Sequence, residues 1–406
     1  MIENEVYQFT NCRIIRDHRI IEDDLWLRNG RVIDPEPLFF DEKKCADKKV
    51  DCHSALIAPG FIDLQINGGL GFDFSDCSID TEAAVTKVAK SIIGDGVTAF
   101  CPTLITQPQD SYHKILPVIK KRNGGKEFGA TILGVHLEGP FISYEKRGAH
   151  PLQHVRGEKI QNIDDIYHFY GYLDDTAIIT MAPELDSADI IKNLVTRNIK
   201  VSIGHSMATL SEGETAIDNG ANFITHLFNA MLPFHHRDPG LVGLLTSKRV
   251  NQRVVYYGII ADGNHTHEAA LKIAFRSSPD GLVLVTDALS ATGLPSGSKL
   301  KIGAQNVEVR ENKAYIEGTQ TLCGSMATMD ECVRNLKKFT GCSVVEAIEC
   351  ATLHPANVLG IADRKGTLNF GSDADFVILD DDLKVMATFI AGQCVFNRTQ
   401  AFNSFL

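Results

Sequence analysis

Eight short apolar runs, rich in β-branched residues, recur between residues 60 and 290 and constrain the possible folds most strongly. They occupy residues 61–66, 97–105, 131–137, 177–183, 201–204, 222–226, 254–261 and 282–288. Segments with helical spacing lie between most of them, for example residues 81–96 and 267–278. Strands that alternate with helices indicate βα units and a parallel sheet. Eight such units predict an α/β fold, a closed (β/α)8 barrel of the TIM type.

An open, doubly wound parallel sheet is the alternative architecture. It is disfavoured because no G-x-G-x-x-G phosphate loop follows the first run. The two ends of the chain, residues 1–56 and 366–397, instead contain short strand-like pieces separated by turn signals. Neither end is long enough to bury a core alone. We therefore expect a small β-sandwich domain from residues 1–56 and 359–406, beside a barrel from residues 57–358.

Composition limits the partners and the compartment. The chain has 40 Lys and Arg against 51 Asp and Glu and a formal net charge of -11, without a basic cluster. Nucleic acid is therefore not an expected partner, since phosphate backbones need a concentrated basic face. Ten scattered cysteines without a C-x-x-C pair indicate reduced thiols. With no secretory signal and no apolar stretch of about 18 residues, we expect a cytoplasmic protein without a membrane partner.

Four ligand-type side chains stand where apolar runs stop. Glu138, His205 and His226 end the runs ATILGVHLEGP, KVSIGHS and ANFITH, and Asp287 ends GLVLVTDALS. The carboxyl ends of strands in a parallel barrel meet at one face, where metal ligands and catalytic groups lie. Two histidines and one glutamate suit a single divalent cation, which polarises a carbonyl and lowers the pKa of a bound water. Zinc fits best, and cobalt, iron or manganese would also fit.

Each of these residues also has an ordinary structural explanation. A lone histidine at a barrel mouth is more often a satisfied polar residue than a ligand, and Asp287 could simply cap the next helix. The combination at four strand ends favours a metal-dependent hydrolase instead. Asp287 would then take a proton from the attacking water and deliver it to the leaving amine. His136 lies two residues before Glu138 on the same face of the strand, so we expect it to have a supporting role.

Seven segments of the chain resemble one family, in the family's order. They are LIAPGFIDLQINGG, HLEGPF, RGAH, GHS, THLFNAM, DGNH and VTDALSATG. Together they resemble the N-acetylglucosamine-6-phosphate deacetylases of the amidohydrolase superfamily, and HLEGPF with GAH, and THLFNAM, are specific to this branch. The resemblance implies a cytosolic enzyme of amino-sugar catabolism that hydrolyses N-acetylglucosamine 6-phosphate to glucosamine 6-phosphate and acetate.

The resemblance also implies roles for individual residues. Glu138, His205 and His226 would bind the metal, and Asp287 would be the catalytic acid and base. His150 would contact the sugar and help to polarise the amide carbonyl. The residues implied to bind the substrate are Gln65, Asn67, Ala149, His150, Asn229, Ala230, Arg237, His265, Leu322, Cys323 and Gly324.

The phosphate of such a substrate needs hydrogen-bond donors. The backbone amides of Asn229 and Ala230 could cradle an anion as at a helix start, and Arg237 supplies a fork-shaped donor. His265 can add another donor. In similar enzymes part of this phosphate site comes from a neighbouring subunit, so a homodimer is implied. The loop TLCGS, residues 321–325, matches a segment that covers the substrate, although the sequence alone predicts only a turn there.

The chain departs from many amidohydrolases after the first strand. They carry H-x-H, whose histidines hold a second metal, whereas this chain has Gln65 and Asn67. Neither amide is a strong ligand for a transition metal, so we expect one divalent ion per subunit. The amides would then be free to hydrogen-bond the sugar or the attacking water.

Two other functions remain open at this point. The first is an amidohydrolase acting on a different N-acyl sugar or amino acid, which the candidate phosphate donors Arg237 and His265 disfavour. The second is a non-catalytic scaffold built on the same barrel, which would lack ligands or the catalytic acid. The three candidate ligands and the candidate catalytic acid, Asp287, are all present here.

Overall fold

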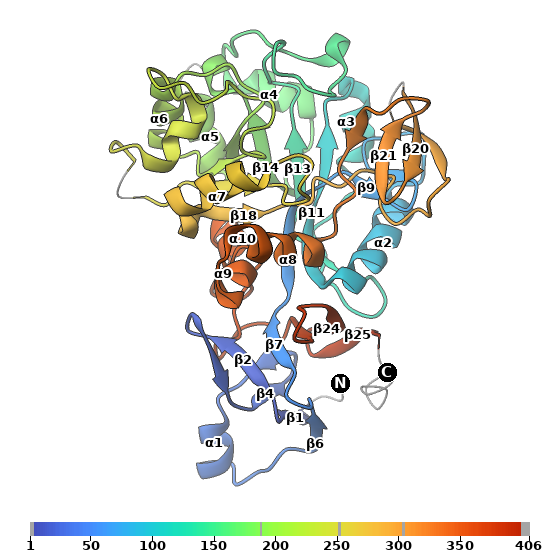
Figure 1. Ribbon diagram of the computed structural model, residues 1–406, viewed down its shortest axis with the longest axis vertical. Helices are drawn as coiled ribbons and strands as arrows, with labels where there is room; N and C mark the ends of the chain where they lie inside the picture. Colours follow the sequence, from blue (N-terminus) through green and yellow to red (C-terminus); the bar gives the residue numbers. More distant parts are fainter. Residues whose placement is uncertain (1–3, 187–188, 251–252, 303–304, 399–406) are drawn as a thin grey trace.

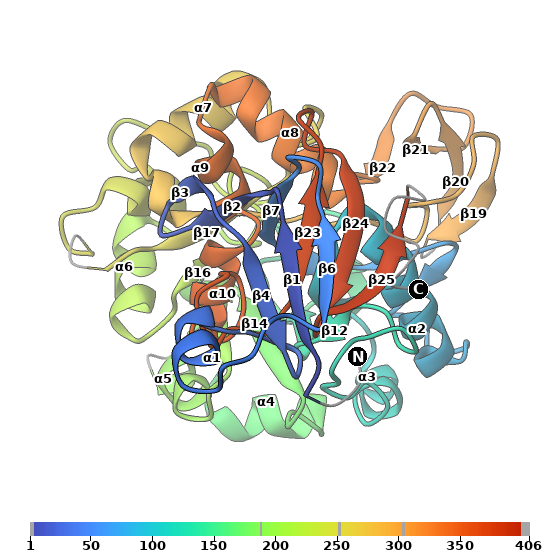
Figure 2. The same ribbon diagram turned by 90° about the horizontal axis from the view of Figure 1, so that it is seen from below.

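The computed structural model describes residues 4–186, 189–250, 253–302 and 305–398 of the chain. A barrel forms the larger part, and a small β domain built from both chain ends lies below it (Figure 1). Seen from below, the strands of the small domain cross in front of the barrel (Figure 2). None of the described helices combines the length and the apolarity that crossing a bilayer requires.

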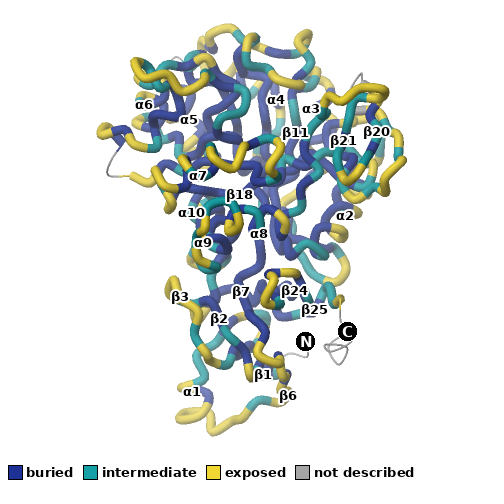
Figure 3. Tube along the Cα trace, in the orientation of Figure 1, coloured by how far each residue is buried: buried dark blue, intermediate teal, exposed yellow. Residues whose placement is uncertain are grey.

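Eight parallel strands form the barrel, and each overlaps one of the predicted runs. They are β8 (Phe61–Ile66), β11 (Val97–Ile105), β13 (Val135–Glu138), β14 (Thr176–Met181), β15 (Lys200–Ile203), β16 (Phe223–Ile224), β17 (Tyr256–Ile259) and β18 (Leu282–Leu284). The short strand β12 (Thr131–Ile132) pairs with β11. These strands are buried (Figure 3), which explains why their sequences are continuous apolar runs and not alternating ones.

The barrel closes between its first and last strands. At the carboxyl end, Ile66 forms a parallel bridge with Ala288, and the Asp287 amide donates to the Gln65 carbonyl at 2.8 Å. Residues 350–351 also link the two strands, because their carbonyls accept hydrogen bonds from the backbone amides of Leu284 and Ile62. The predicted (β/α)8 barrel is confirmed.

Helices surround the barrel. They are α2 (Thr81–Ile92), α3 (Gln109–Ile115), α4 (Ile163–Tyr170), α5 (Asp189–Thr196), α6 (Leu210–Asp218), α7 (Glu268–Ser277), α8 (Met329–Thr340), α9 (Val344–Glu349) and α10 (Leu353–Leu359). Short 3-10 turns are η1 (Ile93–Asp95), η2 (Leu152–His154), η3 (Pro183–Leu185), η4 (Gly240–Thr246) and η5 (Pro279–Gly281). Helix α6 begins with a capping box, in which Thr209 and Glu212 satisfy each other's backbone amides.

Two sheets form the small domain, as predicted for a β-sandwich. One contains β5 (Arg31–Val32), β4 (Leu25–Arg28), β1 (Val6–Thr10) and β6 (Lys48–Asp51). The other contains β25 (Gln393–Asn397), β24 (Val385–Ile390), β23 (Phe376–Leu379), β7 (Leu56–Pro59), β2 (Arg13–Arg16) and β3 (Arg19–Glu22). A short helix, α1 (Pro35–Phe40), lies at its edge. Strand β7 joins the two chain ends, because it pairs with both β2 and β23.

The domain boundaries remain a prediction. Strand β7 carries the small sheet as far as Pro59, beyond the predicted boundary at residue 56. The last part of the predicted segment 359–406, residues 399–406, lies outside the described residues.

A four-stranded antiparallel sheet between β18 and α8 was not predicted. It contains β19 (Lys299–Ile302), β20 (Gln305–Arg310), β21 (Lys313–Ile316) and β22 (Leu322–Gly324), and it projects beside the barrel (Figure 1). Its central hairpin turns at Glu311 and Asn312, whose φ angles are 50° and 58°. Both residues adopt the left-handed conformation without the glycine that normally marks such a turn, so the signal in the sequence is weak. A smaller hairpin, β9 (Gly68–Gly69) with β10 (Phe72–Asp73), follows β8.

The core of the small domain depends on Phe9. Its ring contacts those of Phe376 and Phe389 edge to face, at centroid distances of 5.2 and 5.4 Å. We expect Phe9→Ala to lower the free energy of unfolding by about 3 to 5 kcal/mol, because it leaves a cavity between the sheets. Chemical denaturation followed by circular dichroism measures this. The matched control Phe40→Ala removes a ring that is 74% exposed and should change stability by less than about 0.5 kcal/mol. Equal denaturation midpoints for the two variants would contradict a core role for Phe9.

Candidate active site

The four strand-end residues meet inside the carboxyl mouth of the barrel. Glu138 is the last residue of β13, while His205, His226 and Asp287 follow β15, β16 and β18. The φ angles of His205, His226 and Asp287 are 48°, 24° and 48°. Non-glycine residues adopt such positive angles uncommonly, and functional sites are one place where this strained backbone is found. These bends follow the strand ends; Glu138, His205 and His226 are buried, and Asp287 is half-buried.

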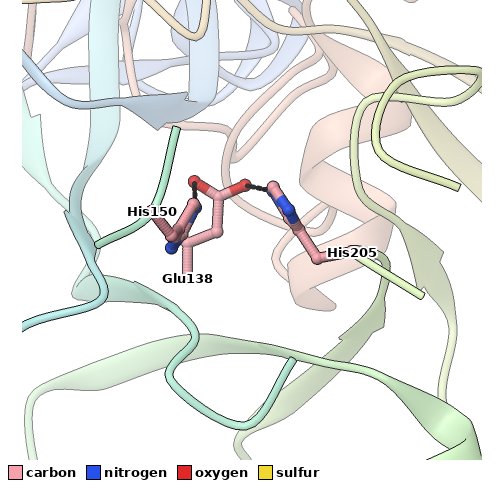
Figure 4. Close-up of side chains that lie close together, drawn as sticks. All are labelled: Glu138, His150 and His205. Carbon is pink, nitrogen blue, oxygen red and sulfur yellow. Dashed lines mark hydrogen bonds and ion pairs between the residues drawn. The ribbon is translucent and has the colours of Figure 1, made fainter. Parts of the chain in front are cut away.

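Glu138 is the centre of the cluster. Its Oε1 lies 3.2 Å from Nε2 of His205 and 3.0 Å from Nε2 of His226, and these two nitrogens are 3.0 Å apart. The other oxygen, Oε2, lies 3.8 Å from Nε2 of His150. Figure 4 shows Glu138 between His150 and His205. Two imidazoles and a carboxylate that converge in this way are the donor set of a borderline divalent cation.

The geometry allows two choices of third ligand. Glu138, His150 and His205 offer ligand atoms that all lie within 4.8 Å of one another. The predicted set replaces His150 with His226, whose Nε2 lies closer to Glu138. Both sets share Glu138 and His205. The donors therefore support a divalent metal site, with either histidine as the third ligand.

Charges inside the cluster balance one another. Burial alone would raise the pKa of Glu138, but hydrogen bonds from His205 and His226 outweigh it and hold that pKa well below its usual range. Burial would lower the pKa of His226, yet Glu138 raises it to about 9. Burial and the Glu138 charge raise the pKa of Asp287 to about 6, and burial beside His205 lowers the pKa of His150 to about 3. At neutral pH Glu138 is thus charged, His150 is neutral, and Asp287 can exchange a proton.

Gln65 and Asn67 hold the two carboxylates. Nε2 of Gln65 donates to Glu138 at 2.8 Å and to Oδ1 of Asp287 at 3.2 Å, and Nδ2 of Asn67 donates to the same Oδ1 at 2.7 Å. Their amide donors are therefore engaged, whereas we expected both amides to be free. The carbonyl oxygens of both amides and Nδ1 of His226 are buried without partners among the described residues. Buried polar atoms are normally satisfied, so the site fits additional polar ligands.

The loop that carries Ala149 and His150 folds over His205. Ala149 is exposed and His150 is buried. A Cβ atom at Gly148 would lie 3.4 Å from Cε1 of His205, so the backbone of the loop covers the imidazole closely. Nδ1 of His205 lies 2.8 Å from the Lys146 carbonyl, in the same loop. The loop thus contributes the His150 side chain to the site and a backbone contact from Lys146 that orients the His205 ring.

The candidate phosphate contacts are more dispersed. No helix begins at Asn229, because residues 225–230 form turns. The Asn229 backbone amide donates to the His226 carbonyl at 3.0 Å, and its contact with an anion stays a prediction. Arg237 is exposed and, within the described residues, forms no ion pair with the cluster. Nδ1 of His265 lies 2.7 Å from Oδ2 of Asp262, and this pairing raises the pKa of His265 against the effect of burial.

The predicted covering segment is a strand and not just a turn. Leu322, Cys323 and Gly324 form β22. The next residue, Ser325, bridges Ala288, and its carbonyl accepts the Leu289 amide at 2.9 Å. The segment is therefore bonded to the loop that follows Asp287.

Asp63 is a buried residue that sequence reasoning missed. It accepts hydrogen bonds from the Thr286 hydroxyl at 2.6 Å and from the Gln65 amide at 3.2 Å, and burial raises its pKa to about 7. It therefore ties β8 to the residue before Asp287. The sequence feature that could have revealed Asp63 is its two-residue spacing to Gln65, which places both side chains on the same face of β8. His136 has the expected supporting role, with Nδ1 at 2.8 Å from the Leu64 carbonyl.

Comparison with known proteins agrees with this geometry. The model of the amidohydrolase family matches residues 56–400. N-acetylglucosamine-6-phosphate deacetylase from Danio rerio is 56% identical over 395 residues, covering 97% of each chain. The Homo sapiens protein of the same name is 55% identical, covering 98% of this chain and 97% of its own. The crystal structure of the Pasteurella multocida deacetylase superposes with a TM-score of 0.83 at 28% identity, covering 96% of this chain and 99% of that one. The chain belongs to the amidohydrolase family and, within it, to the N-acetylglucosamine-6-phosphate deacetylases.

Proposed function

We propose that the protein hydrolyses the acetamide of N-acetyl-D-glucosamine 6-phosphate and releases D-glucosamine 6-phosphate and acetate. One observation carries this proposal: Glu138, His205, His226 and Asp287 converge in the mouth of the barrel of a deacetylase-family chain. Hydrolysis of an amide needs an activated water, an electrophilic carbonyl and a proton for the departing amine. The cluster offers residues for each requirement.

Glu138, His205 and His226 would hold one divalent cation, which we propose to be Zn²⁺. When bound, such a cation polarises the acyl oxygen and lowers the pKa of a water. His205 suits this role because its Nδ1 donates to the Lys146 carbonyl, which leaves a lone pair on Nε2. His226 is preferred to His150 because its Nε2 lies 3.0 Å from Glu138 and His150 lies at 3.8 Å.

Asp287 is proposed to move the proton. Gln65 and Asn67 both donate to its Oδ1, which leaves Oδ2 to accept a proton from the attacking water. The pKa of about 6 lets the same carboxyl then deliver that proton to the leaving nitrogen at neutral pH. His150, neutral and buried, is proposed to donate a hydrogen bond to the acyl oxygen as negative charge develops there.

Substrate contacts beyond this cluster are proposals from the family resemblance. Arg237, His265 and the Ala230 amide would hold the phosphate, with Arg237 acting across a homodimer interface, which its exposure permits. The segment 322–324 would cover the sugar, and the exposed Ala149 would contact it. A cytoplasmic location accords with ten cysteines that form no disulfide among the described residues.

Replacement of the proposed acid and base tests the mechanism. We expect Asp287→Asn to lower kcat by about 100- to 10,000-fold, because an amide cannot exchange the proton. Acetate release measures kcat, and bound metal and the melting temperature are measured in parallel. Asp363→Asn, an exposed substitution after α10, should leave kcat unchanged. Full activity in Asp287→Asn would refute the assigned role.

Metal removal tests the ligand set. Chelation should abolish acetate release, and zinc should restore it with one ion per chain. Glu138→Gln should hold less metal than the wild type, because the carboxylate that both histidines share is lost. Elemental analysis and acetate release measure the two effects. Turnover that persists in metal-free protein would exclude this mechanism.

The phosphate requirement separates this function from hydrolysis of another N-acyl compound. We expect Arg237→Gln to raise KM for N-acetylglucosamine 6-phosphate by about tenfold or more, because a charge-assisted hydrogen bond is lost. The unphosphorylated sugar should be a poor substrate for both proteins, with little difference between them. Equal turnover of the two sugars by the wild type would favour a different N-acyl substrate.

A further inference from the structure

Thr106 lies directly against His150, although no motif marks it in the sequence. It follows the last residue of β11, Ile105, which pairs with Glu138 in the parallel ladder. Thr106 is fully buried. The Tyr112 hydroxyl accepts from the Gln107 amide at 3.3 Å and donates to the Ile105 carbonyl at 3.1 Å. The backbone on both sides of Thr106 is thus held in place by contacts that do not involve His150.

Two groups of Thr106 meet the same nitrogen of His150. The backbone amide of Thr106 lies 3.2 Å from Nδ1, and its Oγ1 lies 2.7 Å from the same atom. A backbone N–H can only donate, so Nδ1 must offer its lone pair. The hydroxyl, which can rotate, then donates to Nδ1 as well. A neutral imidazole has one proton, and in His150 that proton must be on Nε2.

His205 has the opposite arrangement. Its Nδ1 faces the Lys146 carbonyl at 2.8 Å, and a carbonyl can only accept, so in the neutral ring the proton is on Nδ1 and the lone pair is on Nε2. The rings of His150 and His205 are 4.5 Å apart, and the Nε2 atoms of both lie near the Glu138 carboxylate. One histidine therefore presents a lone pair to the site and the other presents a proton.

We propose that Thr106 is a positioning residue that fixes the tautomer of His150, so that Nε2–H donates to the acyl oxygen and His150 is excluded from the metal ligands. The catalytic half of this statement rests on the proposed function, whereas the tautomer itself does not. The proposal also decides between the two possible ligand sets, in favour of His226 and against His150. Glu138, His150 and His205 lie close enough to bind one cation, but a protonated Nε2 cannot coordinate it.

Packing is the competing explanation for Thr106. A Cβ atom at Gly139 would lie 2.4 Å from Oγ1, so this hydroxyl also fills space beside the HLEGPF segment. Thr106→Val preserves the shape and the backbone amide and removes only the hydroxyl. Thr106→Ser keeps the hydroxyl and removes only a methyl group. The pair of variants separates hydrogen bonding from volume.

The tautomer can be observed directly in the resting protein. With ¹⁵N-labelled histidine, NMR correlation spectra distinguish a protonated from an unprotonated ring nitrogen. The signal that disappears in His150→Gln identifies the residue. We expect a proton on Nε2 and none on Nδ1, in the absence of any substrate. A proton on Nδ1 of His150 would overturn the proposal, whether or not the protein releases acetate.

Kinetics test the positioning role. We expect Thr106→Val to lower kcat by about tenfold, the effect of one lost hydrogen bond, with KM within about twofold and bound metal unchanged. Thr106→Ser should restore kcat. The control Thr98→Val makes the same change in a buried threonine at the other end of β11 and should leave kcat unchanged. An unaltered kcat in Thr106→Val, or a loss that serine does not rescue, would overturn the role.

Discussion

The buried carboxylate of Glu138 is the constraint on which the active site depends. A charge at 2% exposure is costly unless opposite charges or hydrogen-bond donors surround it. The Glu138 carboxylate accordingly contacts His205, His226 and the side-chain amide of Gln65, which lie at the ends of three other strands of the barrel. Their convergence is possible because a parallel barrel brings the carboxyl ends of its strands to one face. The charge that makes the site costly is also the charge that suits it to a cation.

The surrounding structure gives chemically similar groups different protonation states. Two histidines differ in tautomer because one faces the Lys146 carbonyl and the other faces the Thr106 amide. Glu138 and Asp287 differ in pKa in the same way, since the histidines stabilise the charge of the first, whereas burial and the Glu138 charge disfavour ionisation of the second. Enzymes commonly separate acid, base and ligand roles by environment in this manner. The backbone of neighbouring loops therefore helps to set the protonation of the candidate catalytic groups.

Much of the fold could be predicted because burial on both faces leaves a plain record in sequence. All eight barrel strands coincide with apolar runs, and the short strands at both ends indicated a shared β domain. The sheet from β19 to β22 was not predicted because its turn at Glu311 and Asn312 lacks the glycine that usually marks a hairpin. The anion cradle at Asn229 and Ala230 stays a prediction. The structure adds that the Asn229 backbone amide donates to the His226 carbonyl, a turn contact that sequence does not reveal.

The sequence by itself determined the barrel, the four strand-end residues and the family, because periodicity, residue type and motif order are all local properties of the chain. Only the tertiary structure decided which atoms meet. It showed that Gln65 and Asn67 donate to Glu138 and Asp287. It also placed Thr106 against His150, 44 residues further along the chain. The physical reason is that a hydrogen bond depends on distance and direction between atoms, and residues distant in sequence acquire both only when the strands pack.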